Sequence, residues 1–142
     1  MFPGHQVDGR WTINQAKGCN TSTIGDRLDL TLECIRLHYA DVHDKFRNPL
    51  GPTLLVYRDF FDLFADFDGY VEFWLLHDLV DGGRVSFFLG GEHGTYDFRA
   101  RTALPRDADE YVSYLERVEE FVLRRNARMA ASWQEQLALS SR

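Results

Sequence analysis

The feature that most constrains this fold is an amphipathic stretch from about residue 24 to residue 42. At about 100° per residue, its apolar side chains form two separate arcs on a helix. A helix that is apolar on two sides must be packed on both, which places it at the centre of the fold. Thr23 is expected to cap its N-terminus, with Asp26 as the reciprocal partner. The wider arc holds Ile24, Leu28, Leu32, Ile35, Tyr39 and Val42, and the second holds Leu30, Cys34 and Leu37.

The stretches on either side of this helix complete a mainly helical pattern. A second helix is expected to begin near Pro52, a third element follows Gly69, and a final helix covers about 107–137. Glycine turns bound a small β-hairpin near residues 84–100, and residues 10–14 suit a short strand. We therefore predict an α+β fold, mainly helical, in which three to four helices pack around the helix at about 24–42.

The bulk composition restricts the classes of function. The 142 residues suit a single domain, 1–142, and an apolar fraction of 44% is enough for a core. A net charge of −6 argues against binding nucleic acid or a membrane surface through a basic face. No stretch approaches the roughly 20 apolar residues of a membrane helix, and the first residues lack a signal-peptide pattern. We expect a soluble, cytoplasmic protein whose cysteines, Cys19 and Cys34, are reduced.

Four chemically distinctive side chains share one line of the central helix. Arg27, Thr31, Cys34 and His38 follow one another at spacings of four, three and four residues. A cysteine one turn from a histidine suggests an activated thiol, whereas a buried cysteine beside an edge histidine is the structural alternative. The cysteines and histidines show neither the CxxC nor the HExxH spacing, so no metal site and no cofactor is predicted.

Anion binding is the second chemistry that this region suggests. Lys17, Gly18 and the hydroxyls of Thr21–Thr23 precede a helix N-terminus, a setting that attracts anions. In an enzyme for a small phosphorylated or carboxylated substrate, Lys17, Arg27 and Arg36 would hold the anion. Glu33 or Asp29 would then act as the general base.

The final helix contributes a further arginine. Arg125 interrupts an apolar seam, and a buried arginine needs a partner, for which Asp26, Asp29 and Glu33 are the candidates. The seam is formed by Tyr111, Leu115, Val118, Val122, Met129 and Trp133. We therefore predict one polar network formed by Asn14, Gln15, Asp26, Arg27, Glu33, Arg36, Arg125 and Asn126.

Four segments resemble the pattern of an uncharacterised bacterial family: TINQAKG, IGDRLDLTLECIRLHY, YRDFFDLFADFDGYVEFWLLHDLV and RRNARM. The resemblance covers about residues 9–129 and implies an established fold with no known reaction, substrate or cofactor. This chain departs from the pattern at Lys17, Leu28, Leu37 and His77. Because the pattern is preceded by a further segment in the family, the chain is expected to be a short member or the C-terminal part of a longer architecture.

Two hypotheses of function follow. The first is a binding or interaction module, acting as a homodimer or as an inhibitor of a partner protein. It would use the aromatic-rich surface between Phe60 and Phe88, because aromatic side chains dominate interface cores. The alternative is the enzyme with its site in the Thr12–Arg36 region. We favour the interaction module, because the chain lacks a standard catalytic motif.

Overall fold

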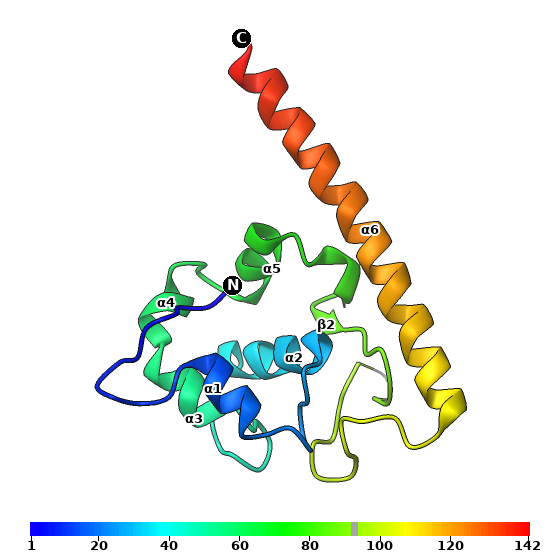
Figure 1. Ribbon diagram of the computed structural model, residues 1–142. Helices are drawn as coiled ribbons and strands as arrows, with labels where there is room; N and C mark the ends of the chain where they lie inside the picture. The colour runs from blue at the N-terminus through cyan, green and yellow to red at the C-terminus, as the bar shows by residue number, and fades with distance from the viewer. Residues whose placement is uncertain (92–93) are drawn as a thin grey trace.

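The computed structural model describes residues 1–91 and 94–142 and confirms a mainly helical α+β fold (Figure 1). Among the described residues, five α-helices accompany the central one where three to four were predicted, because the segment after Leu50 is divided into three short ones. A positive φ angle at Ala65 accompanies the break between the second and third of these, and one at Leu75 ends the third. The elements are α1 (Ile13–Gly18), α2 (Leu28–Tyr39), α3 (Gly51–Val56), α4 (Arg58–Asp62), α5 (Phe67–Trp74), the 3-10 turn η1 (His77–Leu79), β1 (Val80–Asp81), β2 (Arg84–Val85) and α6 (Ala108–Ser140).

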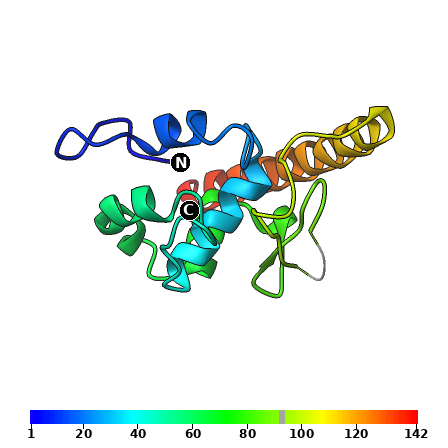
Figure 2. The ribbon, with the colours of Figure 1, turned by 90° about the horizontal axis from the view of Figure 1, so that it is seen from below.

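Helix α2 lies at the centre, as its two apolar arcs predict. Eight of its 12 residues are buried, and it packs against α3, α5 and β2. Helices α3 and α4 lie on one side of it, with the hairpin and α6 on the other (Figure 1, Figure 2). The helix is shorter than predicted, because Gly25 and Asp41 take positive φ angles on either side of it. The predicted Thr23 cap is wrong: Arg27 occupies the N-cap, without a side-chain capping bond.

Residues 10–14 lead into α1 instead of forming the predicted strand. Thr12 Oγ1 accepts a hydrogen bond from the Gln15 amide at 3.2 Å, and Gln15 Oε1 accepts one from the Thr12 amide at 2.8 Å. This reciprocal capping box satisfies two amides that a helix start otherwise leaves unpaired. Ile13 and Ala16 are buried, and α1 packs against α3. Local capping therefore outweighs the β propensity of residues 11–13.

The β-hairpin exists, but it lies before most of the predicted range of 84–100. Val80 pairs with Val85 and Asp81 with Arg84 in an antiparallel register. The connecting Gly82 and Gly83 both have positive φ angles, which the tightest hairpin turns require. This turn pairs β2 with the strand before it. In the later half of the predicted range, residues 95–101, Thr95 alone takes part in a β-bridge. Glu92 and His93, in the predicted loop, lie outside the described residues.

Helix α6 extends beyond the rest of the molecule. Its N-terminal half runs along the body and its C-terminal half projects away (Figure 1). Asp107 caps it by accepting a hydrogen bond from the Glu110 amide at 2.9 Å. Within the described range 94–142, Phe121 is its one buried residue. At 33 residues it is about 50 Å long, more than a body of this size can cover. Neither α6 nor any other described helix has the length and apolar content of a membrane span.

Candidate functional site

Two of the predicted site residues, Arg27 and Asp29, form a buried ion pair at the start of α2. Arg27 donates from Nε to Asp29 Oδ1 at 3.1 Å and from Nη2 to Oδ2. The amide of Phe88 donates to the same Oδ2 at 2.8 Å. Asp29 is fully buried and Arg27 nearly so. With both carboxylate oxygens engaged and no water contact, Asp29 is not placed to act as a general base.

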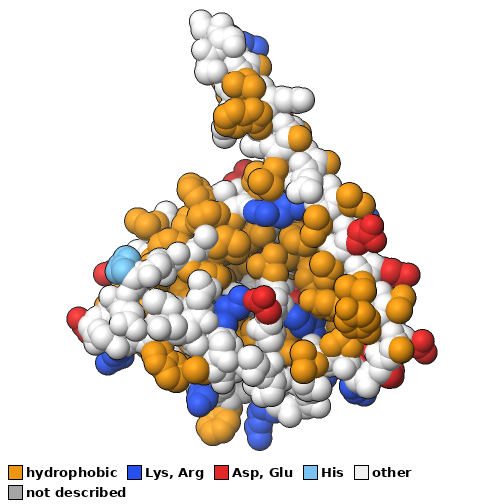
Figure 3. All heavy atoms as spheres, in the orientation of Figure 1, with side chains coloured by type: hydrophobic (Ala, Val, Ile, Leu, Met, Phe, Trp, Pro, Cys, Tyr) orange, Lys and Arg blue, Asp and Glu red, His pale blue; other side chains and the backbone are white. Residues whose placement is uncertain are grey.

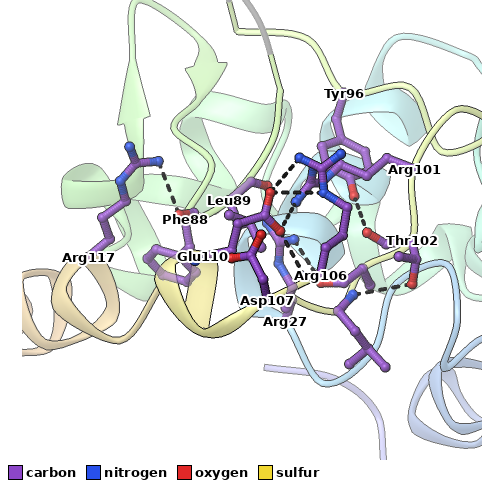
Figure 4. Close-up of polar contacts among 12 residues, drawn as sticks. Arg27, Phe88, Leu89, Tyr96, Arg101, Thr102, Arg106, Asp107, Glu110 and Arg117 are labelled. Atoms are coloured by element: carbon purple, nitrogen blue, oxygen red, sulfur yellow. Dashed lines mark hydrogen bonds and ion pairs between the residues drawn. The ribbon is translucent and has the colours of Figure 1, made fainter. Parts of the chain in front are cut away.

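The remaining donors of Arg27 hold two distant segments against α2 (Figure 4). Nη1 donates to the carbonyl oxygen of Ala103 at 3.0 Å, and Nη2 donates to that of Leu89 at 2.7 Å. The guanidinium also lies 5.7 Å from the Tyr96 ring centre and 5.8 Å from that of Tyr114 on α6. Through these contacts Arg27 connects the start of α2, two loops and α6. Its role is to hold the fold together.

Glu33 and Arg36 form a second pair, one turn along α2, beside a cleft. Arg36 donates from Nε to Glu33 Oε2 and from Nη2 to Oε1, each at 2.7 Å. The Glu33 carboxylate raises the pKa of Arg36 through these bonds. Glu33 is buried, whereas Arg36 is partly exposed at a cleft of about 290 Å³. The other walls of this cleft include Phe46, Arg47, Tyr96, Phe98 and Arg99.

A separate cleft, also of about 290 Å³, lies where the sequence suggests an anion cradle. It is lined by Asn14, Lys17, Gly18, Thr21, Gly25 and Asp26. Lys17 Nζ lies 3.5 Å from the exposed Asp26 carboxylate, which opposes an anion there. Helix α2 begins only at Leu28, so the helix N-terminus that the cradle requires does not follow these hydroxyls directly. Gln15 is engaged in the α1 capping box.

Cys34 and His38 lack the properties of an activated thiol pair. Cys34 is completely buried, and burial raises the pKa of its thiol, which opposes formation of the reactive thiolate. His38 is buried with its ring centre 5.0 Å from those of both His43 and Phe61. Desolvation lowers the pKa of His38 to about 4, with further lowering by the positive charges of His43 and Arg58; Asp62 and Asp41 oppose this.

Arg125 finds its partners in backbone carbonyls, and the predicted pairing with Asp26, Asp29 or Glu33 does not occur. Nη2 donates to the carbonyl oxygen of Trp74 at 3.0 Å, and Nε donates to that of Leu75 at 3.3 Å. Both carbonyls lie at the C-terminus of α5, where a cation is favourable. Asn126, the next residue, is exposed on α6. The predicted single network is therefore divided among separate places in the fold.

The aromatic-rich surface predicted between Phe60 and Phe88 is largely interior. Phe61, Tyr70 and Phe88 are buried, and their rings make edge and tilted contacts with neighbouring aromatic rings. Leu63 and Phe73 are the large apolar side chains of this stretch that are exposed. Beside Leu63 lies an apolar groove of about 550 Å³, formed by the N-terminal segment (Met1–Val7) with α3 and α4.

Most of the exposed large apolar side chains in the described chain lie instead on α6. We define the α6 seam as Tyr111, Leu115, Val118, Val122, Met129, Trp133 and Leu137. Val118 is half-buried and the other six are exposed, Trp133 to 62%. At about 100° per residue these side chains lie on one face, next to the face that contacts the body. Apolar side chains along α6 continue into the hollow beside it (Figure 3).

Sequence reasoning missed two parts of this description. The cleft beside Arg36 is lined by Phe46, Arg47 and Arg99. These residues come from loops without a periodic pattern, so the sequence does not predict that they meet there. The sequence identifies the seam as apolar but does not predict that it is exposed. The length of the predicted helix could have revealed this exposure, because a helix of about 30 residues is longer than the diameter of a 142-residue domain.

Comparisons with known proteins give one match. The model of a family of unknown function, DUF6994, matches residues 1–129. Searches of curated proteins and of solved structures found no match. The matched residues contain α1–α5, the hairpin and α6 as far as Met129, so Trp133 and Leu137 lie beyond them.

Proposed function

This chain belongs to DUF6994, a family of unknown function, and we propose that it is an interaction module that binds a protein partner through the α6 seam. The observation that carries the proposal is a 33-residue helix with one buried residue and an exposed apolar face. Exposed apolar side chains gathered on one helix face are typical of interaction sites. We place the module in the bacterial cytoplasm, in keeping with its composition and the family resemblance.

The arrangement of the seam suits recognition by a helix or by an apolar groove. Leu115, Val122 and Met129 repeat at seven-residue intervals, with Val118 between the first two. Side chains at such spacings are the anchors that helix-in-groove interfaces use. Trp133 and Tyr111 are residue types that contribute most of the binding energy in many interfaces. The proposed surface differs from the Phe60–Phe88 surface, whose rings are mostly engaged in the core.

Site-specific photo-crosslinking in bacterial cells tests this proposal. A photoreactive phenylalanine analogue replaces Trp133 on the seam or, as the matched control, Ala131 on the opposite face of the same exposed turn. We expect a crosslinked species of discrete mass from position 133 and none from position 131. Equal crosslinking from both positions, or none from either, would contradict the proposed function.

The cleft beside Arg36 supports a second candidate function, binding of a small carboxylated or phosphorylated molecule. Three arginines, Arg36, Arg47 and Arg99, line it together with aromatic rings. Arg36 and Arg47 pair with Glu33 and Asp44, while Arg99 lies 6.0 Å from the Phe46 ring centre. Inorganic phosphate at millimolar concentration would raise the melting temperature of the wild-type protein but not of Arg99→Gln. An identical rise in both proteins would exclude this cleft.

A further inference from the structure

The α6 seam is complementary to a copy of itself in reverse orientation, and we infer that its partner is a second copy of this chain in an antiparallel homodimer. The inference rests on the proposed function, since it names the occupant of the same surface. In this arrangement a twofold axis passes near residue 124, and each α6 lies along the seam of the other. Tyr111 then faces Leu137, Leu115 faces Trp133, Val118 faces Met129, and Val122 faces Arg125.

The distribution of charge along α6 selects the antiparallel direction. The half before Val122 carries five carboxylates against one arginine, and the half from Val122 onward carries three arginines against one carboxylate. Glu110 is paired with Arg101 and Arg106, and Arg128 with Asp78, but the difference in sign between the halves remains without them. Antiparallel association brings each acidic half against a basic half, whereas parallel association brings like charges together. The acidic half contains Asp109, Glu110, Glu116, Glu119, Glu120 and Arg117, and the basic half contains Arg124, Arg125, Arg128 and Glu135.

Arg125 lies beside the centre of this arrangement, where its charge is already engaged within its own chain. In the antiparallel pair it meets Val122. Its guanidinium is already turned toward the carbonyls of Trp74 and Leu75, so its aliphatic stem is the part left to cover Val122.

The partner chain also covers the projecting half of α6 in this dimer. Residues after Arg128, which bonds to Asp78 on the body, extend into solvent in the single chain. In the dimer, that half lies along the partner's Tyr111–Val118 half, beside the hollow between α6 and the body (Figure 3). Trp133 and Leu137 thereby gain the apolar cover that their own chain does not supply.

Paired substitutions on one helix test the surface by sedimentation equilibrium of the purified full chain. Leu115→Ala removes a seam side chain, and Leu123→Ala makes the same change off the seam at a residue that is at least as exposed. We expect the wild type to be dimeric. Leu115→Ala and Trp133→Ala should each raise the dissociation constant at least about tenfold, and Leu123→Ala should leave it within about threefold. A monomeric wild type, or equal effects of the two leucine substitutions, would overturn the inference.

Spin labels on the outer face of α6 test the direction. Ala127→Cys and Ala138→Cys are labelled in a Cys19→Ser background, since Cys34 is buried and unreactive. With a rise of about 1.5 Å per residue, an antiparallel pair separates the two labels at 138 by roughly 20 Å more than those at 127. Equal distances at the two positions indicate a parallel pair and would overturn the inference.

The crosslinking experiment separates failure of this inference from failure of the proposed function. A crosslinked product from position 133 at twice the mass of the chain supports the homodimer. A product that contains a different polypeptide leaves the interaction module standing and overturns the second copy as its partner. Absence of any product specific to position 133 overturns both.

Discussion

Asp29→Asn provides the sharpest test of how the centre of this fold is held. The carboxylate is fully buried, accepts two hydrogen bonds from Arg27 and accepts one from the Phe88 amide at 2.8 Å. An asparagine keeps the shape but offers one acceptor oxygen and no charge. Arg27 would then be a buried cation without its carboxylate, a change that typically costs 3–5 kcal/mol, so we expect a loss of about 4 kcal/mol.

Such a loss is large for a domain whose total stability is about 5–15 kcal/mol. Urea unfolding followed by circular dichroism should show the loss as a lower midpoint at unchanged slope, and thermal unfolding should show a drop of roughly 10–15 °C. Asp26→Asn is the matched control, because that carboxylate is exposed and pairs only loosely with Lys17, and the unfolding midpoint should not move.

A double-mutant cycle completes the test. Arg27→Met leaves Asp29 as the unpaired buried charge, while the double variant Arg27→Met/Asp29→Asn contains neither charge. We expect the double variant to lose less unfolding free energy than the two single variants lose together, by at least about 2 kcal/mol. A loss below about 1 kcal/mol for Asp29→Asn, or additive single losses, would refute the assignment of Arg27 and Asp29 as the clamp on α2.

Three further outcomes are expected. The pKa of His38 is about 4 in the folded protein and 6.5 in the unfolded chain, so the free energy of unfolding should fall by up to about 3 kcal/mol as the pH drops from 6.5 to 4. The variant His38→Phe should lack this part of the pH dependence when urea unfolding is measured across the same pH range. Phe121→Ala should cost about 3–4 kcal/mol in urea unfolding of the single chain, whereas Trp133→Ala, outside the body, should cost under about 0.5; equal losses would contradict the burial described here. Gly69→Ala should lower the melting temperature by several degrees, although alanine favours helices, because its Cβ would clash with the Phe64 carbonyl oxygen. A higher melting temperature would disprove the clash.

The polar residues show where reasoning from sequence stopped. Helical spacing correctly places Arg27 and Asp29 at the start of α2, yet their partnership depends on the Phe88, Leu89 and Ala103 backbone, which spacing cannot bring into view. Arg125 was recognised as needing a partner, but carbonyls at a helix C-terminus carry no residue-type signal, so carboxylates were predicted instead. A polar side chain shows that it needs a partner without identifying the partner.

The hairpin and the final helix show the same division. Glycines correctly indicated a tight turn near residue 82, but spacing does not show which strands the turn joins, and positive φ at both Gly82 and Gly83 pairs β2 with β1. In α6, periodicity correctly identified an apolar seam. It did not reveal that most of that seam is exposed, because periodicity describes a face and not what covers it.

By itself, the sequence determined the mainly helical α+β class, the central position of α2 and the extent of the long final helix. These follow from local spacing, capping and turn residues, which act over a few positions. The tertiary structure alone decided which carboxylate pairs with which arginine, that Cys34 is enclosed and that the α6 seam is left open. Those outcomes depend on contacts between residues far apart in the chain, and their burial sets the reactivity of each side chain and the surface offered to a partner.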